Sequence, residues 1–180
     1  MIHIIDGDLF DTDAKYLVHQ VNCCTTKAAH LAYDVFKRYP YADVYSCRDK
    51  SNQFGWSSDE IGNEGPYQTD TPGDILIRGN GQDQRYVIGL LGQFYPGRPR
   101  YPDSTFDGFK ARADYFYQGL LKIGEIKNLE SVAFPYQIGC GAAGGDWGLY
   151  SKILKNFAAH LEDRTTNKAK VLIYRRKDLV

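Results

Sequence analysis

A glycine-rich segment near the C-terminal end of the sequence contains the first residues whose types and spacing suggest chemistry. Four glycines fall within residues 139–145, an apolar run precedes them, and Asp146 and a helical pattern follow. Glycines let backbone N–H groups approach an anion, and the start of the next helix adds unpaired N–H donors and a positive dipole end. The segment therefore predicts a loop that binds a phosphate or diphosphate. The alternative is a turn that only serves a tight connection.

The same segment also matches the fingerprint of dinucleotide-binding folds. Residues 139–144 read GCGAAG, which is G-x-G-x-x-G between a predicted strand and a predicted helix. That fingerprint belongs at the first strand-to-helix turn of its fold. Here only one further strand can follow, so we interpret the segment as an anion-binding loop of another fold.

A second polar segment ends the apolar run of residues 16–21. It contains His19 and Asn22, and ligands of open α/β sheets lie beyond the carboxyl ends of the strands. We therefore expect these two residues to meet the glycine loop in one site. A histidine with an ordinary pKa of about 6.5 can exchange protons there, or it can be a buried core residue. Asp146 could activate water, or it could cap the helix that follows it.

The hydrophobic pattern predicts the elements that must position these residues. Apolar runs predict strands at residues 1–5, 16–21, 74–77, 86–91, 132–134 and 171–174, and helical spacing predicts helices at 28–38, 106–123 and 147–161. Strands that alternate with helices indicate a three-layer α/β domain with a mixed sheet. The length of 180 residues suits one domain, in which residues 46–72 form a long surface excursion.

Composition and charge indicate which kinds of binding partner and which cellular location to expect for the protein. Lys plus Arg and Asp plus Glu both number 22, so non-specific nucleic-acid binding is disfavoured. No apolar run approaches the ~20 residues that span a bilayer, and the first nine residues do not resemble a signal peptide. The four cysteines have neither zinc spacing nor the pattern of a disulfide framework. We expect reduced thiols, a cytoplasmic or nuclear location, and no metal or cofactor.

Three segments together resemble the macrodomain, the ADP-ribose-binding fold. They are IIDGDLF at the start, YLVHQVNC on the second strand, and VAFPYQIGCGAAGGDW before the last helix. The resemblance covers nearly the whole chain apart from residues 46–72. It is closest to the branch that contains the yeast-type ADP-ribose-1''-phosphatase and the terminal ADP-ribose glycohydrolase. It implies a three-layer α/β/α macrodomain with a mixed central sheet.

The resemblance also implies roles for single residues. Asp8 matches the aspartate that accepts a hydrogen bond from the adenine amino group, with the Leu9 backbone beside it, although Asp8 could instead be a turn residue. Asn22 matches the asparagine that contacts the distal ribose, and His19 matches the catalytic histidine of the phosphatase. The loop over the diphosphate would comprise Gly139, Cys140, Gly141, Ala142, Ala143, Gly144 and Gly145.

The segment after Asn22 departs from the family pattern. Most macrodomains have a glycine-rich run there, whereas residues 23–30 contain no glycine and include Lys27 and His30. The glycohydrolase carries its catalytic lysine in this region, but its catalytic aspartate falls nearer Ala143 than Asp146. Lys27, His30 and the loop N–H groups could together neutralise a phosphate.

We therefore expect a monomeric hydrolase that binds ADP-ribose or phosphorylated ADP-ribose, with His19 and Asp146 as catalytic residues. Removal of the 1''-phosphate from ADP-ribose-1''-phosphate is the favoured reaction. One alternative is release of ADP-ribose from modified protein or nucleic acid, which would be the protein's only use of nucleic acid. The other alternative is a module that reads ADP-ribose without turnover.

Overall fold

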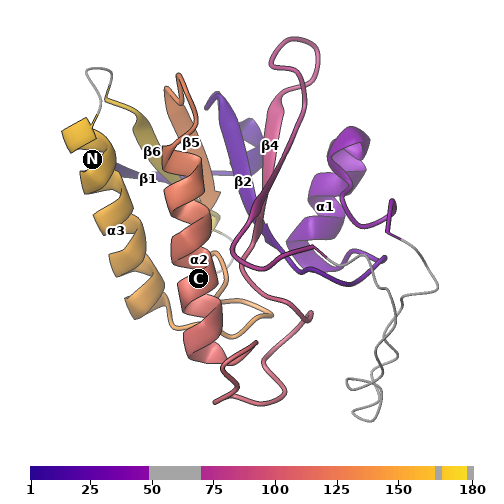
Figure 1. Ribbon diagram of the computed structural model, residues 1–180. Coiled ribbons are helices and arrows are strands. Elements are labelled where there is room, and N and C mark those ends of the chain that lie inside the picture. The colour runs from indigo at the N-terminus through magenta and orange to yellow at the C-terminus, as the bar shows by residue number, and fades with distance from the viewer. Residues whose placement is uncertain (49–69, 165–167, 178–180) are drawn as a thin grey trace.

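The computed structural model describes residues 1–48, 70–164 and 168–177 (Figure 1), and the strands and helices named below are those of these ranges. The strands are β1 (Ile2–Asp6), β2 (Tyr16–Val21), β3 (Ile75–Arg78), β4 (Tyr86–Leu91), β5 (Ser131–Pro135) and β6 (Lys170–Arg175). The helices are α1 (His30–Arg38), α2 (Phe109–Gly124) and α3 (Trp147–Arg164), with short 3-10 helices η1 (Leu9–Asp11) and η2 (Pro40–Ala42). Each predicted strand and helix is present, with ends that differ by a few residues.

The strands form one mixed sheet in the order β1-β6-β5-β2-β4-β3. All neighbouring strands are parallel except β3, which runs antiparallel to β4. Strands β3 and β4 form a hairpin, and Gly79 and Gly81 in its loop have φ values of 99° and 75°, which residues with a Cβ rarely adopt. Because β2, β4 and β5 are parallel, their carboxyl ends meet at one edge of the sheet.

Helices cover both faces of the sheet, which gives the three-layer α/β/α arrangement that the sequence predicts (Figure 1). Helices α2 and α3 lie side by side and share a core with Tyr16 and Val18 of β2. Helix α1 packs with Leu17 and Val21 on the opposite face. Since side chains alternate along a strand, β2 contributes to both cores, and consecutive residues at its end point to opposite sides.

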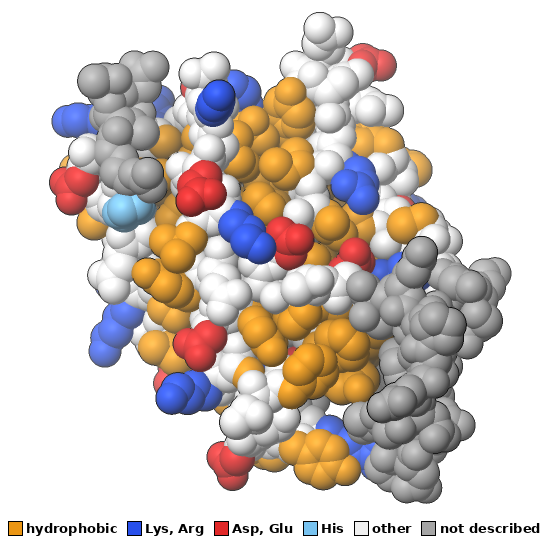
Figure 2. All heavy atoms as spheres, in the orientation of Figure 1, with side chains coloured by type: hydrophobic (Ala, Val, Ile, Leu, Met, Phe, Trp, Pro, Cys, Tyr) orange, Lys and Arg blue, Asp and Glu red, His pale blue; other side chains and the backbone are white. Residues whose placement is uncertain are grey.

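The predicted excursion at residues 46–72 lies mostly outside the described residues. Arg48 and Asp70 are described, and an ion pair of 2.6 Å joins them. No helix in the ranges that the structure describes is both long and apolar enough to cross a membrane. On the face shown in Figure 2, acidic and basic side chains are interspersed among apolar ones.

Candidate functional site

A cavity of about 290 Å³ opens at the carboxyl edge of the sheet, between the ends of β2, β4 and β5 and the start of α1. It brings together the two segments that the sequence indicates, because Asn22 and most of the glycine loop line it. The side chains and backbone that line it are Gln20, Asn22, Lys27, Ala29, His30, Leu31, Ala32, Tyr45, Gln93, Pro96, Gly97, Pro135, Tyr136, Gln137, Ile138, Gly139, Gly141, Ala142 and Ala143. Gly144 and Gly145 border a second hollow instead.

The glycine loop has the close backbone packing that its composition predicts. The Gly145 N–H donates to the Gly139 carbonyl at 3.0 Å, and φ is 74° at Gly139. A Cβ at Gly139 would lie 2.6 Å from the Tyr150 ring, whereas a Cβ at Gly141 would meet nothing within 4 Å. Gly139 is therefore required by the fold, and Gly141 leaves the cavity wall open to a ligand.

Cys140 lies between these two glycines but is a poor nucleophile. Its Sγ donates to the Ile138 carbonyl at 3.4 Å, and burial raises the pKa of the thiol to about 12. Since the thiolate is the reactive form, this cysteine acts as a small packing residue.

Asn22 presents one end of its carboxamide to the cavity. Its Oδ1 accepts hydrogen bonds from the Cys24 N–H (3.1 Å), the Thr25 N–H (2.9 Å) and the Thr25 hydroxyl (3.0 Å). Within the described ranges, Nδ2 of Asn22 has no hydrogen-bond partner. Asn22 can therefore donate to an oxygen atom of a ligand.

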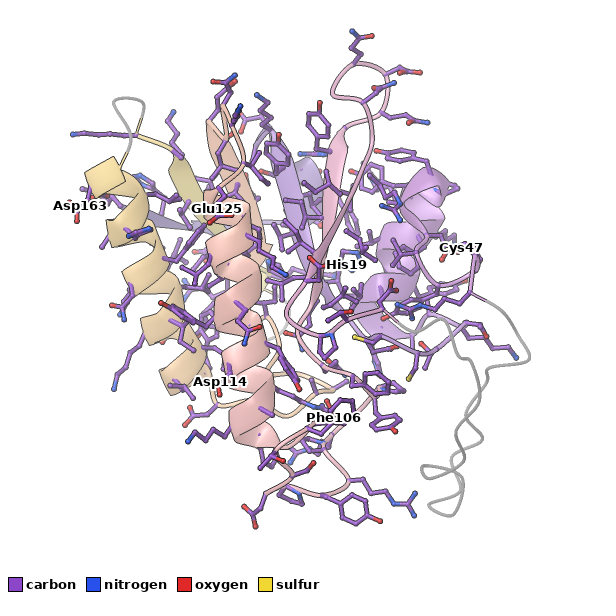
Figure 3. The ribbon with its side chains drawn as sticks, in the orientation of Figure 1. His19, Cys47, Phe106, Asp114, Glu125 and Asp163 are labelled. Carbon is purple, nitrogen blue, oxygen red and sulfur yellow. The ribbon has the colours of Figure 1, made fainter. Side chains whose placement is uncertain are left out.

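His19 lies in the core and does not line the cavity, and Figure 3 shows its place inside the molecule. It is 1% exposed and packs edge-on against Phe36 of α1 at 5.4 Å. Neither ring nitrogen has a hydrogen-bond partner among the described residues, and burial lowers the pKa of the imidazole to about 3. This is the core histidine that the sequence left as the alternative. The geometry gives no support to His19 as a proton donor.

Gln20, the residue after His19, lines the cavity, whereas His19 does not. Its Nε2 donates to Gln93 Oε1 at 2.7 Å, and Gln93 Nε2 donates to the Tyr95 carbonyl at 2.8 Å. A backbone carbonyl only accepts, so it fixes the orientation of Gln93, which in turn fixes Gln20. Gln20 was not among the residues predicted for the site. The signal in the sequence was its two-residue spacing from Asn22, which places both on one side of β2.

Asp146 directly precedes α3 and does not line the cavity. Its Oδ1 accepts a hydrogen bond from the Gly148 N–H at 2.7 Å, which is the capping role that the sequence allowed. It borders the second hollow, between α2 and α3, together with Gly144 and Gly145. The structure therefore does not bring the two expected catalytic residues, His19 and Asp146, together.

Asp8 and Leu9 follow β1 at the same edge of the sheet, outside the cavity wall. Asp8 Oδ1 accepts from the Phe10 N–H at 2.9 Å and caps η1, while Leu9 is 5% exposed and packs in the core beside α1. The turn role of Asp8 is thus observed. Its contact with an adenine amino group remains a prediction.

Lys27 and His30 place two basic side chains on the cavity wall. Both residues are exposed, and His30 is the first residue of α1. His30 has a φ of 53°, in the left-handed region that glycine usually occupies. The glycine-free segment after Asn22 therefore still makes a sharp turn into the helix, and it adds a lysine and a histidine to the cavity wall.

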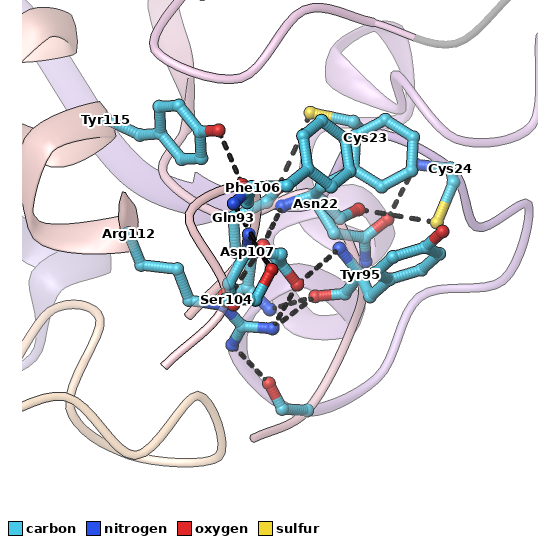
Figure 4. A network of polar contacts seen from close by, with 12 residues as sticks. Asn22, Cys23, Cys24, Gln93, Tyr95, Ser104, Phe106, Asp107, Arg112 and Tyr115 are labelled. Atoms are coloured by element: carbon cyan, nitrogen blue, oxygen red, sulfur yellow. Dashed lines mark hydrogen bonds and ion pairs between the residues drawn. The ribbon is translucent and has the colours of Figure 1, made fainter. Parts of the chain in front are cut away.

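A buried arginine holds the loop that follows β4 (Figure 4). Arg112 is 2% exposed, pairs with Asp107 at 2.7 Å, and donates to the Gly97 carbonyl at 2.5 Å. Asp107 Oδ1 in turn accepts from the Phe94 N–H at 2.7 Å. Gly97 lines the cavity, so this network shapes one wall without contacting the space inside.

Within the part of the chain that is described, no group of three or more His, Cys, Asp or Glu side chains is placed to hold a metal ion.

Comparisons with known proteins identify the fold. No protein-family model matches the sequence, and no curated protein matches it. Among solved structures, the macrodomain of Mycobacterium tuberculosis DarG is similar, with a TM-score of 0.64, 24% identity, and 97% of each chain covered. The macrodomain of Thermus aquaticus DarG has a TM-score of 0.62 and 18% identity, with 97% of this chain and 98% of that chain covered. A Trypanosoma brucei macrodomain in complex with ADP-ribose has a TM-score of 0.60 and 14% identity, with 98% of this chain and 65% of that chain covered. The chain thus has the α/β macrodomain fold, with its mixed six-stranded sheet between layers of helices.

Proposed function

We propose that this protein binds ADP-ribose or a derivative of it in the cavity at the carboxyl ends of β2, β4 and β5. The observation that carries the proposal is that Asn22 and the glycine loop, more than a hundred residues apart, line one cavity. The open backbone around Gly141 suits a diphosphate, and Asn22 Nδ2 suits a hydroxyl oxygen of the terminal ribose. The likeness to a macrodomain solved with ADP-ribose supports the same ligand.

The reaction that the cavity supports best is hydrolysis of the bond between the terminal ribose and a modified protein or nucleic acid. Lys27 lines the cavity together with Asn22. C1'' of the linked ribose bears both the ring oxygen and the bond to the modified group. The neutral amine of Lys27 would attack C1'' as a nucleophile, the bond to the modified group would break, and the proton lost by the amine would pass to the leaving oxygen or nitrogen. Water would then attack C1'', break its bond to the lysine nitrogen and return a proton to the amine, which releases ADP-ribose.

Removal of a 1''-phosphate is the second candidate, and one observation favours it. Lys27 and His30 line the cavity together with the backbone of Gly139, Gly141, Ala142 and Ala143, and hydrolysis of a phosphate monoester requires basic side chains and N–H donors of this kind around the phosphoryl group. Since His19 lies in the core, the proton for the leaving oxygen would come from His30 or from water.

Product analysis on three substrates tests the proposal. The protein is incubated with mono-ADP-ribosylated protein, ADP-ribosylated DNA and ADP-ribose-1''-phosphate, and released ADP-ribose and inorganic phosphate are measured. We expect release of ADP-ribose from at least one of the first two, and phosphate release alone would select the second candidate. Binding of ADP-ribose without turnover of any substrate would leave a reader module. Absence of both binding and turnover would contradict the proposal.

A further inference from the structure

Arg48 uses its whole guanidinium group to hold the segment that carries Asn22. Nη2 donates to the Asn22 carbonyl at 2.7 Å, and Nη1 donates to the Thr25 carbonyl at 2.8 Å and to Asn22 Oδ1 at 3.4 Å. Nε and Nη2 both donate to Asp70 Oδ2, at 3.1 and 2.6 Å. A guanidinium has five N–H groups, and these five hydrogen bonds occupy all of them. Arg48 therefore has no donor left for a ligand.

Two further residues hold the same segment. The hydroxyl of Tyr45 accepts from the Asn22 N–H at 2.9 Å, and the guanidinium of Arg48 lies 4.7 Å from the centre of the Tyr45 ring. The Asp70 N–H donates to the Cys23 carbonyl at 3.2 Å. The Arg48 side chain is 6% exposed, so these contacts are largely shielded from water, and they fix the backbone from which the Asn22 side chain projects.

We propose that Arg48 is a positioning residue, which orients the Asn22 carboxamide so that Nδ2 donates to an oxygen of the terminal ribose. A carboxamide can turn over and exchange its donor and acceptor ends. Here Oδ1 is surrounded by donors from Cys24, Thr25 and Arg48, so only one orientation is stable. The identity of the ligand in this inference rests on the proposed function. The role of Arg48 rests on the hydrogen bonds.

Substitution of Arg48 by lysine tests this role. Lysine keeps the positive charge beside Asp70 but has one nitrogen, which cannot span the Asn22 carbonyl, the Thr25 carbonyl and the carboxylate together. We expect Arg48→Lys to lower the affinity for ADP-ribose about tenfold, which corresponds to about 1.4 kcal/mol. The affinity for ADP, which lacks the terminal ribose, should change by less than about twofold, since in the proposed complex Asn22 would contact only that ribose.

A double-mutant cycle separates positioning from a general structural role. If Arg48 acts through Asn22, the double variant Arg48→Lys, Asn22→Ala should bind ADP-ribose as weakly as Asn22→Ala alone. The matched control is Arg85→Lys, because Arg85 also holds two backbone carbonyls, those of Thr12 and Ala14, outside the cavity wall. Arg85→Lys should lower the melting temperature without a selective loss of ADP-ribose binding.

Failure of the positioning role of Arg48 can be distinguished from failure of the proposed ADP-ribose binding. Equal losses of ADP and ADP-ribose affinity in Arg48→Lys, or additive losses in the double variant, would overturn the role of Arg48. If the unmodified protein binds neither ligand, the proposed function fails instead. Should Arg48→Lys not fold, Tyr45→Phe removes the hydroxyl that accepts from the Asn22 N–H. It should then give a smaller loss with the same preference for ADP-ribose over ADP, and no such preference would contradict the proposal.

Discussion

At the scale of single residues, His19 and Gln20 are neighbours in β2, yet they lie on opposite faces of the sheet. The resemblance to the phosphatase implies a catalytic role for His19. The alternation of side chains along a strand instead pairs Gln20 with Asn22, and both residues line the cavity. Periodicity alone could have found Gln20, whereas Arg48 and Asp70 reach Asn22 and Cys23 through contacts that no local pattern records.

The buried imidazole of His19 predicts a dependence of stability on pH. Burial lowers its pKa to about 3 in the folded protein, against about 6.5 in the unfolded chain. Below pH 6.5 the unfolded chain therefore takes up a proton that the folded protein excludes. Stability from this source is complete above a pH of about 6.5 and is lost as the pH falls towards 3, by up to about 1.4 kcal/mol per pH unit.

Urea denaturation between about pH 7.5 and 4.5 measures this effect. His19→Phe should flatten the decline in the free energy of unfolding with falling pH, and it should leave hydrolysis and ADP-ribose binding unchanged. His3→Gln, a change at an exposed histidine, is the control that should leave the decline as it is. A large loss of turnover in a folded His19→Phe variant would show that His19 takes part in the hydrolysis.

Lys27 is the residue on which the proposed hydrolysis depends most. Lys27→Ala should slow the release of ADP-ribose from modified protein or nucleic acid by roughly 10²-fold or more. Because Lys27 is exposed, its loss should change the free energy of unfolding by no more than about 0.5 kcal/mol. Lys37→Ala, at an exposed lysine towards the other end of α1, is the matched control. Equal rates for the two variants would remove Lys27 from the mechanism.

At the scale of elements, the glycine loop and the start of α1 form two walls of one cavity. The composition of the loop predicts an anion-binding character, and the structure adds that its glycines differ in purpose. Gly139 packs against Tyr150 and the Gln20 carboxamide, while Gly141 borders open space. The sequence could not distinguish them, because the difference depends on how the loop packs against α3 and β2 in three dimensions.

Alanine substitutions should separate these two glycines. Gly139→Ala places a Cβ 2.6 Å from Tyr150 at a φ of 74°, so we expect it to lower both stability, by about 1–3 kcal/mol, and ADP-ribose affinity. Gly141→Ala meets nothing within 4 Å. It should keep the melting temperature and weaken only the ligand, since its methyl group covers backbone that the diphosphate would approach. Thermal denaturation and calorimetric titration of both variants decide this, and a stable Gly139→Ala with unaltered affinity would refute the distinction.

At the scale of the whole molecule, the fold was predictable because each strand and helix is marked by a local apolar pattern. The run of residues 16–21 predicted β2 with the same bounds. The site was predictable only where its residues stand at strand ends or in the glycine loop. The residues that hold the site in place could not be predicted from the sequence. They are Gln93, Tyr45 and Arg112, which form hydrogen bonds with residues distant in the sequence.

Ligand binding should stabilise the whole fold, because the cavity is built from segments that span most of the chain. At a concentration of ADP-ribose about one hundred times its dissociation constant, binding adds about 2.7 kcal/mol. For a domain of this size that corresponds to a rise in melting temperature of roughly 5–10 °C. Differential scanning fluorimetry measures this rise in melting temperature. Asn22→Ala should show a smaller rise at the same concentration, and an equal rise in both proteins would place the ligand away from Asn22.

A crystal structure of the protein with ADP-ribose tests the central claim most directly. We predict the diphosphate over the loop of residues 139–145, with the terminal ribose within hydrogen-bond distance of Asn22 Nδ2 and beside Lys27. Density for the ligand in the hollow between α2 and α3, or a terminal ribose directed away from Asn22, would contradict the account.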